Sequence, residues 1–168
     1  MSKAVGTAIL TLALSLTPAM GHARADANPG FEKLKMLVGE WDGTDAQGKS
    51  VRVSYKLVSA GTTLLETLSP DGESEMITLY TMDGDQVALT HYCSANNQPR
   101  MRTMPNAGDA DELDFSFVGA TNLANPGVGH MHGLVISFQD RDHFTQEWTW
   151  RERGQADKVE IFRFARKK

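Results

Sequence analysis

The chain has 168 residues, a formal net charge of −4 at pH 7 and one cysteine. This length fits a single domain, and an acidic chain without a basic block does not suit nucleic acid as a partner. A single cysteine excludes an internal disulfide, so we expect stability to come from burial and backbone pairing.

The first 25 residues are predicted to be an export signal. Lys3 supplies a positive charge, residues 4–16 form an apolar run, and Ala23-Arg24-Ala25 fits a small-x-small cleavage site. The run is shorter than the roughly 20 residues that a membrane-spanning helix needs. We therefore expect a cleaved signal over residues 1–25, a mature domain over residues 26–168, a periplasmic or secreted location, and no stable membrane insertion after cleavage.

The mature chain begins with one amphipathic segment and continues with strand-like segments. Phe31, Leu34, Leu37 and Val38 recur at helical spacing, which predicts one or two turns of helix capping the open end of a barrel. Period-2 segments follow at 41–46, 51–57, 62–68, 76–82, 86–94, 100–104, 113–118, 131–139, 144–152 and 159–165. Turn signals such as Asp83-Gly84-Asp85 separate them. About ten short strands with short connections predict an all-β, antiparallel up-and-down barrel, whose closure removes exposed sheet edges.

Two histidines alternate with apolar residues on these strands. Successive strand residues point to opposite faces, so His91 shares a face with Val87 and Leu89, and His132 shares one with Leu134. We therefore expect both imidazoles to point into the barrel.

These positions suggest a ligand pocket, since pockets combine apolar walls with a few placed polar groups. We predict a polar lining of His91, Arg100, Arg102 and His132, with Trp148 in the wall. The arginines suit a carboxylate or another anion. The predicted function is non-covalent binding of a small hydrophobic or amphipathic molecule by a monomer or weak dimer.

Two other interpretations use the same residues. His91, Cys93, His130 and His132 are nitrogen and sulfur donors suited to zinc or copper, and His91 or His132 could be an axial ligand of haem. No compact Cys/His motif selects a cofactor. The third interpretation is an interaction module with a packed interior and core histidines. Nothing marks an activated nucleophile or an oxyanion hole, so no enzymatic activity is predicted.

Gly39-Glu40-Trp41, at the start of the first strand, resembles the Gly-x-Trp signature of the lipocalin-like calycin barrels. The resemblance implies that Trp41 plugs one end of the barrel and that a basic residue late in the chain packs across its ring. Arg163 and Arg166 are both candidates for that residue. Such a contact contributes about 0.5–2 kcal/mol.

Residues 31–43, 89–102 and 130–168 resemble a family of small exported bacterial proteins whose function is unassigned. Nitrobindin, a ten-stranded haem-binding barrel, is a more distant resemblance. Trp41-Asp42-Gly43 fits its longer Gly-x-Trp-x-Gly-x-Gly pattern, but Asp45 stands in place of the last glycine.

Overall fold

The computed structural model describes residues 28–105, 107 and 111–168. The predicted export signal, 1–25, lies outside these residues. The elements are α1 (Pro29–Lys35), β1 (Gly39–Thr44), β2 (Ser50–Val58), a 3-10 turn η1 (Ser59–Gly61), β3 (Thr63–Pro70), β4 (Met76–Asp83), β5 (Gln86–Tyr92), β6 (Gln98–Arg102), β7 (Glu112–Thr121), β8 (His130–Phe138), β9 (His143–Arg151) and β10 (Lys158–Arg166). No helix in the described ranges is long and apolar enough to cross a membrane.

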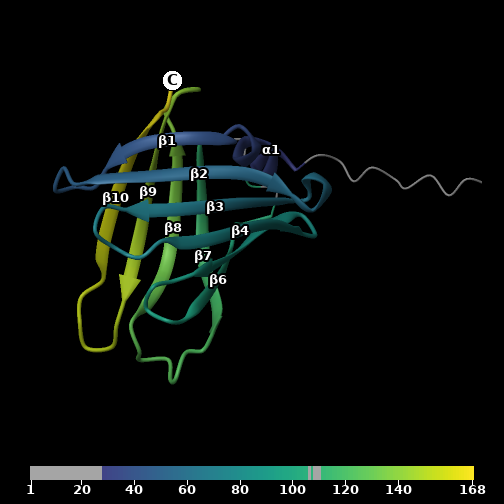
Figure 1. The fold of residues 1–168 in the computed structure, drawn as a ribbon. Coiled ribbons are helices and arrows are strands. Elements are labelled where there is room, and N and C mark those ends of the chain that lie inside the picture. The colour runs from purple at the N-terminus through teal and green to yellow at the C-terminus, as the bar shows by residue number, and fades with distance from the viewer. Residues whose placement is uncertain (1–27, 106, 108–110) are drawn as a thin grey trace, which may run out of the picture.

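The strands form a closed antiparallel barrel in which each strand pairs with its neighbours in sequence and β10 returns to β1. This confirms the predicted fold class. In Figure 1, β1–β4 cross the molecule at a steep angle to β7–β10, and the view from below shows these two groups as facing walls. Register fixes the closing seam: Trp41 pairs with Arg166, and Thr44 pairs with Arg163.

Period-2 alternation builds the core, because each strand turns every second side chain inward. The aromatic residues that the strands contribute to the buried core are Trp41, Tyr55, Tyr80, Phe115, Phe144, Trp148, Phe162 and Phe164. Leu64 and Leu68 lie beside them from β3, both almost fully buried. The interior of this barrel is therefore mostly filled by side chains.

Helix α1 closes one end of the barrel, as its apolar spacing predicts. Asn28 caps it by accepting a hydrogen bond from the Phe31 backbone N–H, 3.1 Å away, and Pro29 fits its first turn. Phe31 and Leu34 are buried against the strands. Gly30 is required by close approach, because a Cβ there would lie 2.5 Å from the carbonyl oxygen of Ala107.

Two irregularities interrupt the alternation near the opposite, open end. On β8, Met131 pairs with Trp150 and Gly133 pairs with Thr149, so His132 is an extra residue without a partner across the strand. This is the pattern of a β-bulge, which re-aims side chains. A second register shift lies between Arg100 and Met101 on β6.

Candidate functional site

A buried carboxylate lies at the centre of the barrel. Glu66 is inward on β3 and has no exposed surface. Its Oε2 accepts hydrogen bonds from the Tyr80 hydroxyl at 2.8 Å and from Gln146 Nε2 at 2.7 Å, and its Oε1 accepts one from the Thr78 hydroxyl at 3.1 Å. Burial raises the pKa of Glu66, although the hydrogen bonds from Tyr55 and its other partners oppose that shift.

His91 joins this network from β5 and points into the interior, as its alternation with Val87 and Leu89 predicts. Its Nδ1 lies 2.9 Å from the Thr78 hydroxyl oxygen, and its ring packs on Trp148 with the centroids 4.5 Å apart. Burial lowers the pKa of His91 to about 4, so the ring is neutral at neutral pH. Its Nε2 is buried and has no hydrogen-bond partner within the described chain. A buried polar atom of this kind calls for an explanation.

The open end holds a small cavity next to this imidazole, with a volume of about 20 Å³. It is lined by Leu68, Pro70, Glu73, Met76, His91, Met131, Trp148, Glu160 and Phe162. A space of about 10–15 Å³ holds one water, so the cavity accommodates a single small polar group. Because Thr78 occupies Nδ1, Nε2 is the ring nitrogen available to such a group.

A wider groove adjoins the cavity and shares Met131, Trp148 and Glu160 with it. Its volume is about 280 Å³, and Trp150, Lys158 and Val159 complete its lining. The Trp150 ring packs closely against Gly129, where an added Cβ would come within 2.2 Å of the ring. The cavity and groove together give a polar position inside and, outside it, an aromatic and aliphatic surface flanked by Lys158 and Glu160.

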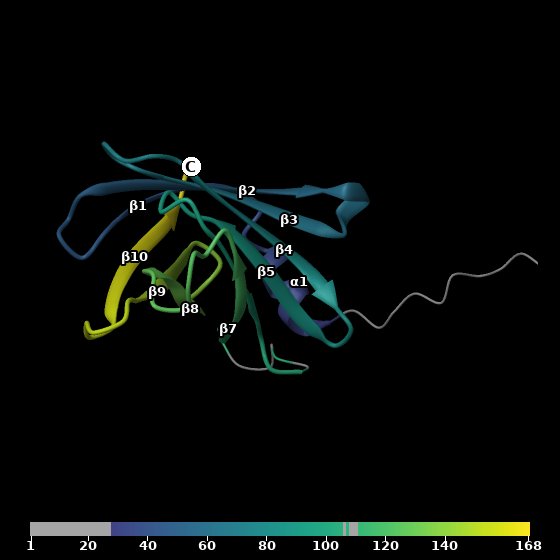
Figure 2. The same ribbon diagram turned by 90° about the horizontal axis from the view of Figure 1, so that it is seen from below.

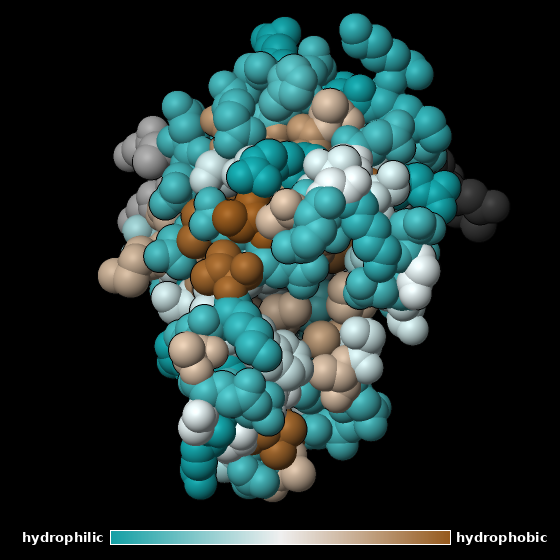
Figure 3. Space-filling view, turned by 90° about the vertical axis from the view of Figure 1, so that its left-hand side faces the viewer, coloured by the Kyte–Doolittle hydropathy of each residue, from teal (hydrophilic) through white to brown (hydrophobic). Residues whose placement is uncertain are grey.

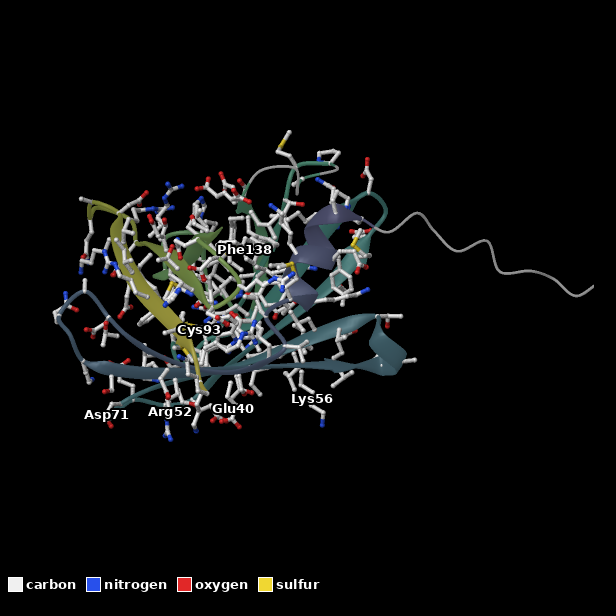
Figure 4. All side chains as sticks on the ribbon, turned by 90° about the horizontal axis from the view of Figure 1, so that it is seen from above. Glu40, Arg52, Lys56, Asp71, Cys93 and Phe138 are labelled. Atoms are coloured by element: carbon white, nitrogen blue, oxygen red, sulfur yellow. The ribbon has the colours of Figure 1, made fainter. Side chains whose placement is uncertain are left out.

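A larger hollow on the described surface has a volume of about 710 Å³ and is built differently. It is lined mainly by polar and charged residues of β1, β2 and the turn after β3, including Asp42, Arg52, Asp71, Glu73 and Glu75. Arg52 and Asp71 point away from the barrel, as do Glu40 and Lys56 (Figure 4). These side chains form a solvated outer surface and have no buried polar atom aimed into the hollow.

His130 and His132 contact each other, but they do not join His91 in one polar lining. His130 Nε2 lies 3.0 Å from His132 Nδ1, and Phe117 packs against both rings. His130 Nδ1 is held by the Val128 carbonyl oxygen at 2.8 Å. The bulge interrupts the alternation of β8 at His132, whose ring stacks on Phe117, two residues after buried Phe115 on β7. Burial lowers the pKa of His132, helped by the positive charge of Arg151.

The predicted metal donors do not converge. Within the described residues, no group of three or more His, Cys, Asp or Glu side chains could hold a metal ion. Cys93 lies just after β5 and is partly buried, which raises the pKa of its thiol. Its backbone N–H bonds to the Asn97 carbonyl in the turn that follows.

Arg100 and Arg102 lie on the outer face, contrary to the prediction that they line the interior. Met101, between them, is fully buried and takes the inward position. Arg102 forms an ion pair with Asp83 at 2.6 Å, with both side chains about half exposed. The physical reason is the cost of burying an unpaired charge, which a methionine avoids.

Arg166, rather than Arg163, packs on Trp41. Its guanidinium carbon lies 4.1 Å from the centroid of the indole, and it donates hydrogen bonds to the carbonyl oxygens of Met36 and Val38. The Trp41 indole N–H donates to the Leu37 carbonyl at 2.7 Å. Arg163 is exposed on β10. The side chains of Trp41 and Arg166 therefore join the two ends of the chain at the closed end of the barrel.

Sequence reasoning missed Glu66, Thr78 and Gln146 as site residues. Glu66 could have been found from the alternation of β3, because it lies between Leu64 and Leu68 on the inward face. A charged residue on an apolar face indicates a buried partner set. Its partners could not be found that way, because Gln146 is 80 residues away in sequence.

Comparisons with known proteins support the fold. No protein family and no curated protein matches the sequence. Among solved structures, Rv2717c from M. tuberculosis is similar with a TM-score of 0.60 and 15% identity, over 85% of this chain and 100% of that one. A protein of unknown function from the DUF3598 family of Nostoc punctiforme is similar with a TM-score of 0.55 and 15% identity, over 80% of this chain. The match spans 48% of the Nostoc chain, about half its length. At this identity, the likeness shows a shared barrel fold.

Proposed function

We propose that this chain is an exported, lipocalin-like barrel that binds a small molecule non-covalently at its open end. The observation that carries the proposal is His91, which is buried, neutral and without a partner at Nε2, beside a cavity that adjoins an apolar groove. Leaving a buried polar atom unsatisfied costs about 1–3 kcal/mol. A ligand whose polar group reaches His91 removes that cost and buries its apolar part against Trp148 and Trp150.

The volumes limit the ligand to a small molecule. Typical ligand pockets have volumes of about 300–1,000 Å³, whereas the groove has about 280 Å³ and the cavity about 20 Å³. Haem does not fit this space. An imidazole with an available nitrogen can serve as an axial ligand of haem, but the cavity beside His91 accommodates only a group the size of water. We therefore propose no role for haem at His91.

Export and a monomeric or weakly dimeric state are part of the same proposal. Export rests on the charged, apolar and small-residue pattern of residues 1–25. The oligomeric state rests on the surface: the face shown in Figure 3 is mainly hydrophilic, with small separate hydrophobic groups. Stable interfaces are usually marked by larger contiguous apolar patches.

The first experiment is native mass spectrometry of the protein recovered from the periplasm of an expressing bacterium, followed by titration with hexan-1-ol. We expect a polypeptide cleaved after Ala25, and a bound mass that is lost on denaturation. The purified protein should show saturable quenching or enhancement of tryptophan fluorescence with hexan-1-ol, because Trp148 and Trp150 line the groove.

Two variants locate the binding site. Met131 pairs with Trp150 and lines both the groove and the cavity, whereas Val118 on β7 is 54% exposed and lines neither. Met131→Arg should weaken hexan-1-ol binding at least about five-fold by placing a hydrated charge over the apolar wall. Val118→Arg should leave the affinity unchanged. Equal effects of the two variants, or no bound mass and no saturable binding, would contradict the proposal and favour an interaction module with a packed interior.

A further inference from the structure

The donors and acceptors of the buried network can be assigned by starting from Trp148, whose indole N–H can only donate. The indole N–H of Trp148 donates to Gln146 Oε1 at 3.1 Å, which fixes the orientation of that amide. The amide nitrogen of Gln146 then faces Glu66 Oε2 at 2.7 Å and the Tyr55 hydroxyl at 2.8 Å. Glu66 is thus surrounded by donors and acts as the acceptor at the centre of the network.

This direction sets the tautomer of His91. When Glu66 is an ionised carboxylate it can only accept, so the single hydroxyl proton of Thr78 is donated to Glu66 Oε1. The hydroxyl oxygen must then accept from His91, 2.9 Å away, so the imidazole proton is on Nδ1. Nε2 therefore carries an unpaired lone pair on a ring that lines the cavity. A lone pair is complementary to a hydrogen-bond donor and repels another acceptor.

The charged residues around the cavity also disfavour an anionic ligand. Glu73 and Glu160 line it, and no lysine or arginine does so among the described residues. Lys158 lines only the outer groove, and Lys49 is paired with Glu73 at 3.2 Å. Burial raises the pKa of Glu160, and the negative charges of Glu73 and Asp45 raise it further, against the opposing charge of Lys49. The same negative charges repel an anion placed in the cavity.

We infer that the polar group of the ligand is a hydrogen-bond donor, neutral or cationic, such as a hydroxyl or an ammonium, and that it occupies the cavity beside His91. This inference rests on the proposed function and specifies its ligand class. It replaces the anionic ligand suggested by Arg100 and Arg102, which lie on the outer face. The apolar part of the ligand lies in the groove against Trp148, Trp150 and Met131.

Four probes with the same six-carbon chain test the inference: hexan-1-ol, its methyl ether, hexylammonium and hexanoate. Affinity is measured by tryptophan fluorescence at about pH 7.5 with the mature protein. We expect the alcohol to bind roughly five-fold more tightly than the ether, which accepts but does not donate. Hexylammonium should bind at least about five-fold more tightly than hexanoate, since nearby carboxylates attract the cation and repel the anion.

A matched pair of variants isolates the electrostatic part. Glu160→Gln should reduce the preference for hexylammonium over hexanoate about two-fold or more, because it removes one charge at the cavity. Glu112→Gln, at the opposite end of the barrel, should leave the preference unchanged. Ether binding equal to that of the alcohol, or hexanoate binding equal to that of hexylammonium, overturns the inference while the proposed function stands. Absence of binding by all four probes overturns the proposed function itself.

Discussion

The burial of His91 predicts a loss of folding stability in mild acid. The unfolded chain binds a proton at the ordinary imidazole pKa of 6.5, whereas the folded chain does so only at about 4. As pH falls from 6.5 towards 4, protonation therefore stabilises the unfolded state alone. The full effect of this shift is about 3 kcal/mol, of which about 2 kcal/mol is lost between about pH 7.5 and about pH 5.

The variant His91→Asn tests this linkage. An asparagine amide can donate to the Thr78 hydroxyl as Nδ1 does, but it does not titrate. Urea unfolding, followed by circular dichroism at both pH values, should show a decrease in the free energy of unfolding that is about 2 kcal/mol smaller in the variant than in the wild type. The raised pKa of Glu66 has the opposite effect: it lowers the free energy of unfolding as pH rises past 4.5, the ordinary pKa of the group. Glu66 is present in both proteins, so this effect contributes to both measurements.

The control is Thr90→Asn, which changes the neighbouring position on the other face of β5 and should keep the wild-type pH dependence. If His91→Asn loses as much stability in acid as the wild type, His91 is already protonated or hydrated in the folded state. The assignment of a neutral, buried ring would then be refuted.

Two further substitutions test the closed and open ends of the barrel by urea unfolding. Arg166→Ala should reduce the free energy of unfolding by about 1–3 kcal/mol, because it removes a cation–π contact and hydrogen bonds to carbonyl groups. Arg163→Ala, at an exposed position, is the control and should change the free energy of unfolding by less than about 0.5 kcal/mol. Equal losses in the two variants would contradict the contact between Arg166 and Trp41. Gly129→Ala should cost about 1–3 kcal/mol and shift tryptophan emission, because the added Cβ meets the Trp150 ring at 2.2 Å. Gly133→Ala, whose Cβ has no neighbour closer than 3.7 Å, serves as its control, and similar behaviour of the two alanines would show that Trp150 does not lie against Gly129.

Local sequence patterns are sufficient to predict the barrel. Period-2 alternation and turn signals depend on neighbouring residues, so they can be read locally, and they predicted about ten antiparallel strands and a short helix. The inward orientation of His91 followed from the same rule, because β5 is regular from Val87 to His91.

The surroundings of His91 depend on contacts between strands that are distant in the sequence. A one-residue bulge leaves His132 without a partner across the strand, and nothing in the local pattern of β8 marks it. Glu66 and Gln146 meet because closure brings β3 and β9 to the same interior layer. Hydrogen-bond partners of this kind depend on strand register across the whole barrel, which is set by the packing of every strand together.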